Sequence, residues 1–332
     1  MRSKAEVFQE HFNVRTYEEA SNIYQANSDS GPRLPLSSCT KLTLPYEASS
    51  HPGIPSFEEI AIGMKNNKIS ERFGYRDENC KVRVPKLYAL FSRGGDIHPP
   101  YYMVMEFIEG ELMNYKKWVS LSSEQREKVH CKISEQLQLL RSVPSEGYYG
   151  RVKTQGFYPQ ITFVQTDGEQ IRGPYRSYED LLSAMHAAAE IQGGITISSE
   201  NDPEVYTPEQ KLHLSEFKFR LGKCSGHEPK LTHVDPGMQN WVVRPLDGSM
   251  QSASDYEVTF IDWGGLGWFP AWVQMASFDT AIRGTFYDKT TGFDENEENR
   301  FLARVAQGLE ESYAEAREFY GKVFESCSYG IY

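Results

Sequence analysis

Two segments of the chain place acidic or amide residues on turn-rich loops beside short apolar strands, and this repeated arrangement constrains the fold most strongly. The first segment reads Thr-His-Val-Asp-Pro-Gly-Met-Gln-Asn-Trp-Val-Val from residue 232. The second reads Val-Thr-Phe-Ile-Asp-Trp-Gly-Gly from residue 258. Turn formers followed or preceded by β-branched and aromatic residues predict a pair of neighbouring strands, 241–243 and 258–261.

The loops of these segments carry two carboxylates and one side-chain amide, which are the groups that phosphoryl transfer requires. One carboxylate must lie near the attacking hydroxyl, while a second carboxylate and a neutral oxygen hold Mg²⁺ between the phosphates. The spacing His-x-Asp-x4-Asn lets the loop double back, so that Asp235 faces the acceptor and Asn240 faces the metal, with Asp262 as the second carboxylate. Alone the spacing is weak evidence, because three fixed positions arise by chance in roughly one chain of this length in twenty-five. Asp235 could also be a cap, since Asp-Pro-Gly is an ordinary turn signal.

Composition limits the classes of partner. The chain has 332 residues, and 35 Lys+Arg against 46 Asp+Glu give a net charge of -11. Because an acidic surface repels a phosphate backbone, we expect no nucleic-acid binding. No apolar run reaches the roughly 20 residues of a membrane helix, no signal peptide is visible, and the odd number of dispersed cysteines forms no CxxC pair. A cytoplasmic protein without a membrane partner is the simplest interpretation.

The order of predicted elements indicates an α+β fold with two lobes. Antiparallel strands are predicted over 82–91 and 101–108. Capping residues and apolar stripes predict helices over 16–25, 57–68, 122–143, 177–191 and 207–221, and a further helical pattern passes through Phe301, Val305, Leu309 and Tyr313. The division that follows is a small strand-rich N-lobe, residues 1–107, and a larger helical C-lobe, residues 108–332.

A third motif, Met-Glu-Phe-Ile-Glu-Gly, covers Met105 to Gly110. With this motif, the chain resembles the aminoglycoside phosphotransferase and choline kinase family of protein-kinase-like enzymes, above all its fungal members. That family reads His-Gly-Asp-x4-Asn in the catalytic loop, Ile-Ile-Asp-Trp-Glu in the metal loop and Met-Glu-Tyr-Ile-Glu-Gly between the lobes. The matching positions here are His233, Asp235 and Asn240, then Asp262 and Trp263, then Met105 to Gly110. The similarity covers roughly residues 56 to 275.

The resemblance implies a role for each matching residue, with ATP and Mg²⁺ as cofactors. Asp235 would orient the acceptor hydroxyl or accept its proton, Asn240 and Asp262 would bind Mg²⁺, and His233 would brace the loop structurally. The adenine would bond to the carbonyl of Glu106 and the amide of Ile108, with Met105 lining the base pocket. Acceptor residues are expected from the larger lobe, and the candidates by location are Tyr175, Tyr178, Glu179 and Asp180. Acidic groups there would suit a cationic small molecule.

The family pattern also fails at several positions. Val234 replaces the usual glycine, Gly264 the usual glutamate, and Gly237 a frequent histidine. No glycine-rich turn or Val-x-Lys strand appears before residue 55, so the best candidate for the phosphate-gripping lysine is Lys41, with Glu58 or Glu59 as its partner.

These departures leave open a second hypothesis, a kinase-like protein that does not transfer phosphate and serves as a binding module or a repurposed catalyst. A protein kinase is a weaker third hypothesis. Little chain separates Asp262 from the next expected helix, which leaves little room for an activation segment.

Overall fold

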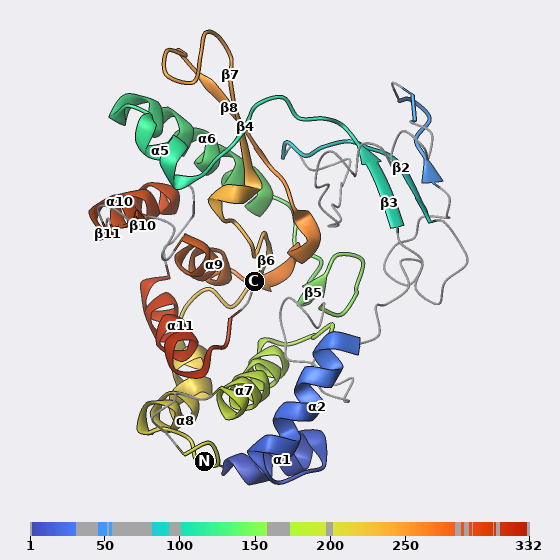
Figure 1. The fold of residues 1–332 in the computed structure, drawn as a ribbon, viewed down its shortest axis with the longest axis vertical. Helices are drawn as coiled ribbons and strands as arrows, with labels where there is room; N and C mark the ends of the chain where they lie inside the picture. The colour runs from blue at the N-terminus through green and yellow to red at the C-terminus, as the bar shows by residue number, and fades with distance from the viewer. Residues whose placement is uncertain are drawn as a thin grey trace.

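The structure is a computed structural model that describes most of the chain. The described residues are 2–30, 46–51, 53–54, 82–92, 101–157, 173–196, 202–282, 287–288, 292–293, 295–307, 309 and 313–330. They combine helices with small antiparallel sheets, so the predicted α+β class is confirmed. A three-stranded sheet lies beside a larger, mostly helical part (Figure 1).

The small sheet has the strand order β1-β2-β3, and both pairs are antiparallel. Its strands are β1 (Tyr46–Glu47), β2 (Leu87–Ser92) and β3 (Tyr101–Met105). The Phe91 ring stacks on Tyr102 across the sheet, with 5.6 Å between the ring centroids. The predicted antiparallel strands are therefore confirmed, although β2 begins only at Leu87, because Val82 is buried in the core of the helical part.

One core cluster lies between helices and the sheet with strand order β4-β7-β8. Its elements are β4 (Glu111–Leu112), α5 (Tyr115–Ser120), α6 (Ser123–Arg141), β7 (Trp241–Pro245), β8 (Tyr256–Phe260) and α10 (Glu295–Ala306). The Trp241 ring stacks on Phe301 at 5.4 Å, and Trp118 meets the same ring edge-on at 5.5 Å. Buried aromatic rings contribute large apolar areas. They fix β7, which follows the first motif loop, against the helices.

A second core cluster joins the N-terminal helices to three later ones. These elements are α1 (Lys4–Phe12), α2 (Tyr17–Ser30), α7 (Tyr178–Ile195), α8 (Pro208–Lys223) and α11 (Ala314–Cys327). Val7, Phe8 and Phe12 are buried. Close packing on α7 depends on Gly194, where a Cβ would come within 2.9 Å of the Phe8 ring.

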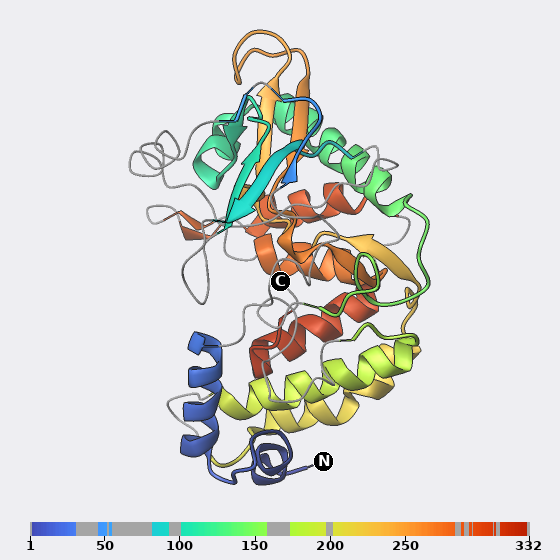
Figure 2. The same cartoon turned by 90° about the vertical axis from the view of Figure 1, so that its right-hand side faces the viewer.

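Two features of the start of the chain were not anticipated from the sequence. Helix α1 was not predicted, although Ser3 and Glu6 form a capping box, which is a recognisable start signal. The division into residues 1–107 and 108–332 stays a prediction, and within the first range α1 and α2 pack on α7, at the opposite end of the long axis from the small sheet (Figures 1 and 2). The physical reason is the apolar face of α1, which is buried against α7 rather than against strands.

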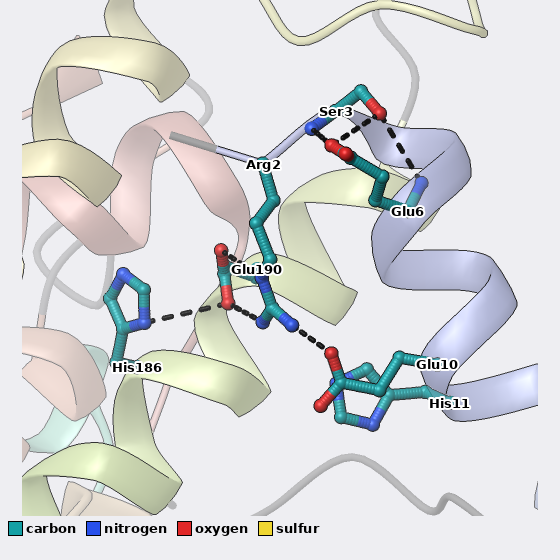
Figure 3. Close-up of polar contacts among 7 residues, drawn as sticks. All are labelled: Arg2, Ser3, Glu6, Glu10, His11, His186 and Glu190. Atoms are coloured by element: carbon teal, nitrogen blue, oxygen red, sulfur yellow. Dashed lines mark hydrogen bonds and ion pairs between the residues drawn. The ribbon is translucent and has the colours of Figure 1, made fainter.

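A polar cluster also anchors the N-terminus to α7 (Figure 3). Glu190 is buried, with 2% of its surface exposed, and its carboxylate accepts bonds from the Nε and Nη2 groups of Arg2. His186 Nδ1 lies 3.4 Å from the same carboxylate, and Arg2 also pairs with Glu10. A buried carboxylate is costly unless it is paired in this way. Arg2 therefore links α1 to α7 through its ion pairs with Glu10 and Glu190.

The remaining elements surround the motif loops. The third sheet has the order β5-β9-β6, with β5 (Gly150–Arg151), β6 (Pro229–Thr232) and β9 (Gly267–Pro270). They are accompanied by the short 3-10 helices η2 (Met238–Asn240) and η3 (Trp263–Gly265), helix α9 (Val273–Ile282), and the pair β10 (Tyr287–Asp288) and β11 (Gly292–Phe293). Of the helical pattern predicted through residues 301–313, only Phe301 and Val305 lie in a helix, because α10 ends at Ala306 and Tyr313 is the left-handed N-cap of α11.

Several predictions concern residues outside the described ranges. They are the helix over 57–68, the proposed lysine Lys41, and its partners Glu58 and Glu59. Among the described helices, none combines the length and the apolar character needed to cross a membrane.

Candidate functional site

The first motif loop connects β6 to β7 and is closed by its own asparagine. Asn240, buried at the end of η2, donates from Nδ2 to the backbone carbonyl of Asp235 at 2.9 Å. Its backbone N–H also bonds to the carbonyl of Gly237 at 2.9 Å. The side-chain bond uses the NH₂ group, whereas Oδ1 is the atom that a magnesium ion would require. The loop therefore doubles back, as its spacing predicts.

The second motif loop follows β8 and is joined to the first by backbone. The N–H of Ile261 donates to the carbonyl of Asn240 at 2.9 Å, which extends the antiparallel pairing of β7 and β8. The predicted strand pair is thus confirmed, and it brings Asn240 next to the residue before Asp262. Asp262 itself has φ 60 and ψ 60. This left-handed conformation is uncommon outside glycine, and such strained residues gather at functional sites.

His233 lies beneath both loops. Its Nε2 atom is 3.1 Å from the carbonyl oxygen of Ile261. Because a carbonyl only accepts, Nε2 carries the proton, and Nδ1 has no partner among the described residues. Burial lowers the pKa of His233, opposed by the Ile261 bond and by the charges of Asp235 and Asp262. A neutral histidine that bridges the loops suits the bracing role that the resemblance implies.

Gln274, in the first turn of α9, holds the first loop from the other side, and sequence reasoning missed it. Its Oε1 accepts the N–H of His233 at 3.1 Å, and its Nε2 donates to the carbonyl of His233 at 2.9 Å. The side chain is fully buried. The available signal was a single glutamine within the otherwise apolar run Ala-Trp-Val-Gln-Met-Ala, since a buried amide requires partners.

The departures from the family pattern have local explanations. Val234, where the family has glycine, is fully buried in the second core cluster, so its side chain faces the core. Gly264 lies half-buried in η3, directly after the predicted metal loop, and supplies no carboxylate. Gly237 is the N-cap of η2 and has an ordinary negative φ.

The connection between the small sheet and the helical part begins where β3 ends. The N–H of Glu106 bonds to the carbonyl of Lys86 at 2.7 Å, and its carboxylate accepts two bonds from Arg83, at 3.0 and 3.2 Å. The bond from Arg83 is the main cause that lowers the pKa of Glu106. The side chain of Glu106 is therefore held by a partner and is not a solvated charge. Met105 is exposed and Ile108 is half-buried.

The predicted acceptor residues occupy one region but have different surroundings. Tyr175 is buried and exchanges two backbone bonds with Tyr149. The Tyr178 ring stacks on His227 at 3.9 Å, its hydroxyl donates to the carbonyl of Leu221, and burial raises its pKa. Glu179 and Asp180, by contrast, are exposed in the first turn of α7. The two tyrosines are packed and hydrogen-bonded whereas the two acids are exposed, and acceptor binding by all four residues stays a prediction.

The described residues contain no group of three His, Cys, Asp or Glu side chains arranged for a metal. The predicted magnesium ligands differ from such a group, because they are one amide and one carboxylate completed by phosphate oxygens. Two open hollows of about 640 and 560 Å³ lie instead along α1, α7 and α8. Their lining includes Arg2 and Glu190, which pair with each other, and Lys4, which donates to the carbonyl of Pro203.

Comparisons with known proteins give similarities of structure only. No protein-family model matches the chain, and no curated protein matches it in sequence. Aminoglycoside phosphotransferase APH(2'')-Ib bound to ADP is 13% identical, with a TM-score of 0.42 over 83% of this chain and 73% of that one. The GDP and kanamycin complex of APH(2'')-IIia is 11% identical, with a TM-score of 0.44 over 94% of this chain and 76% of that one. An ethanolamine kinase from Plasmodium vivax is 12% identical, with a TM-score of 0.36 over 81% and 61%.

Proposed function

We propose that this protein is a phosphotransferase that uses Mg·ATP to phosphorylate a hydroxyl group of a small molecule. The observation that carries the proposal is the joining of the two motif loops. Asn240 bonds to Asp235 through its side chain and to Ile261 through its backbone, so that all three predicted groups stand on one connected turn system.

The roles follow from the chemistry of each side chain. Asp235 is half-buried and would orient the acceptor hydroxyl and accept its proton. Asn240 and Asp262 would hold magnesium, and their neutral and anionic oxygens are the hard ligands that this ion prefers. When bound, magnesium neutralises the charge that develops on the phosphates. His233 and Gln274 keep the loop in place through their bonds to its backbone and to Ile261.

A small acceptor fits the chain better than a polypeptide. Only η3 and β9 lie between Asp262 and α9, which begins at Val273. A protein kinase requires a long activation segment at this point to bind its substrate peptide. We further propose that the acceptor is cationic, because Glu179 and Asp180 place two acids on one helix end.

Turnover of ATP tests the function. Purified protein with ATP, Mg²⁺ and a panel of hydroxylated metabolites, amino alcohols and aminoglycosides should release ADP with at least one acceptor. Asp235→Asn should lower kcat by about 10²–10⁴-fold, because proton transfer contributes that much. Asp247→Asn, the same change on the exposed β7–β8 hairpin, should leave kcat unchanged. Turnover that survives in Asp235→Asn would contradict the mechanism.

A kinase-like protein without transferase activity is the second candidate, and Gly264 favours it, because the family places a glutamate there. Calorimetric titration with Mg·ATP separates the two. Binding of nucleotide without ADP release, across the whole panel, would support a binding module. Binding that is weakened in Asp262→Asn and accompanied by turnover would support the transferase.

A further inference from the structure

The segment that precedes β2 belongs to the helical part as much as to the small sheet. Val82 is buried in the core cluster that also contains Ile133 and Leu137 of α6. The N–H of Arg83 donates to Oε1 of Gln136, also on α6, at 2.8 Å. The chain therefore leaves α6 at residue 83 and enters the small sheet at Leu87.

Arg83 then bonds to the stretch of chain that follows β3 and leads into the helical part, which we call the connection. Its guanidinium donates twice to the carboxylate of Glu106, from Nη1 at 3.2 Å and from Nη2 at 3.0 Å. Oε2 of Glu106 also accepts the backbone N–H of Lys86 at 3.1 Å. Together with the Glu106 N–H bond to Lys86, these contacts hold Glu106 by both its side chain and its backbone.

Further charges continue the chain of contacts onto the sheet of the helical part. Nε of Arg83 is 3.8 Å from Glu257 on β8, and Glu257 accepts bonds from Arg244 on β7 at 2.7 and 3.0 Å. Arg244 in turn lies 4.0 Å from Glu109 within the connection. We call these five residues the hinge network. Its charges alternate, so each arginine lies between two carboxylates.

Within the hinge network, Arg83 is the residue best suited to fix the backbone position of Glu106. An exposed ion pair with one contact contributes little, whereas a planar guanidinium that binds a carboxylate twice also fixes its orientation. Arg83 and Glu106 expose 34% and 21% of their side chains. Their bond raises the pKa of Arg83 and lowers that of Glu106, so both groups stay charged across the physiological range.

We propose that Arg83 is a positioning residue for nucleotide binding, which holds Glu106 so that the backbone of the connection meets the base in a fixed geometry. This inference rests on the proposed function and on the contacts that the family resemblance implies, in which the Glu106 carbonyl and the Ile108 amide would bind the base. Arg83 reaches the base only through Glu106. Its removal should therefore weaken nucleotide binding and leave the chemistry at Asp235 unchanged.

Two measurements on the full chain test the inference. The first is hydrogen exchange without nucleotide, followed at the Glu106 amide that bonds to Lys86. Arg83→Gln and Glu106→Gln should each speed its exchange by about 10-fold, because either change removes the fork that holds the residue. Arg304→Gln, which breaks the exposed pair with Glu127 on α6, is the matched control and should change the rate by less than about 2-fold.

The second measurement is affinity for Mg·ATP by calorimetry, together with kcat and KM. Arg83→Gln should raise Kd and KM by about 10-fold with kcat within about 2-fold, the pattern expected when binding is lost equally in the ground state and the transition state. The double variant should lose no more than either single one, since both remove one interaction. Arg83→Lys, which keeps the charge without the fork, should give an intermediate affinity and guards against a general loss of folding.

Unchanged exchange at Glu106 in Arg83→Gln would overturn the inference, and so would faster exchange with unchanged nucleotide affinity. A parent protein that binds no nucleotide would instead overturn the proposed function. The exchange comparison requires no nucleotide, so it still decides whether Arg83 holds the connection.

Discussion

His130, on α6, shows how burial alone sets the behaviour of a single residue. Its ring meets Trp118 edge-on at 4.9 Å and lies 5.0 Å from the Phe301 ring. Burial lowers the pKa of His130 from 6.5 to about 4, and the charge of Glu297 opposes the shift only in part. Nδ1 has no partner among the described residues. The native protein therefore holds this histidine neutral well below pH 6.5.

We expect His130 to make stability depend on pH. As pH falls below 6.5, the unfolded chain takes up a proton that the native state refuses until about pH 4. The free energy of unfolding should fall by about 3 kcal/mol over that window, following linkage. His130→Phe, which keeps a ring against Trp118, should remove this part of the slope. Urea denaturation of both proteins from pH 7 to pH 4 measures it, and equal slopes would contradict the assignment.

Among single residues, the sequence identified those whose signal is a short motif. Asp235, Asn240 and Asp262 stand on connected loops, as their spacing predicts, although their roles stay predictions. Arg83 could not be recognised in this way. Its partner Glu106 is 23 positions away, and only the antiparallel pairing of β2 with β3 brings the two together.

At the scale of elements, helix starts were predictable because their signals are local. Ser122, Ser177 and Thr207 are the N-caps of α6, α7 and α8, and they are the residues at which these helices are predicted to begin. Helix ends and breaks were less predictable. The apolar stripe through residues 301–313 reads as one helix, but the left-handed Tyr313 starts a new one, and periodicity carries no signal for that change.

Contacts between elements were harder to predict still, and Gln274 is the clearest case. It joins α9 to the first motif loop by pairing with both backbone groups of His233. Gln274→Ala should lower the free energy of unfolding by about 2–4 kcal/mol, because two buried backbone groups lose their partners. Hydrogen exchange at the His233 amide should also become faster. Denaturation in urea and exchange measurements would record the two effects.

The control for this prediction lies on the same helix. Ser277 is equally buried, and its hydroxyl has no partner among the described residues. Ser277→Ala should therefore change the free energy of unfolding by less than about 1 kcal/mol. If the two variants lost the same stability, the cause would be packing of α9, and the bonds to His233 would not be responsible.

At the scale of the whole molecule, the sequence predicted the composition of the fold better than its arrangement. The order of strands and helices indicated a small sheet beside a helical part. The apolar face of α1 could have shown that this helix is buried, but a stripe does not name its partner. Only the complementary surface of α7, with Gly194 opposite Phe8, decides that the N-terminal helices pack far from the small sheet (Figure 2).

If α1 is part of this core, a change within it should affect the global unfolding of the helical part. Phe8→Ala should lower the free energy of unfolding by about 3–5 kcal/mol, because the ring is fully buried. Gln9→Ala, on the next position of α1, should cost less than about 1 kcal/mol. The alternative is an appended helix that detaches alone. In that case Phe8→Ala would leave unchanged the urea concentration at which α7 and α8 unfold. Hydrogen exchange would become faster only over residues 4–12.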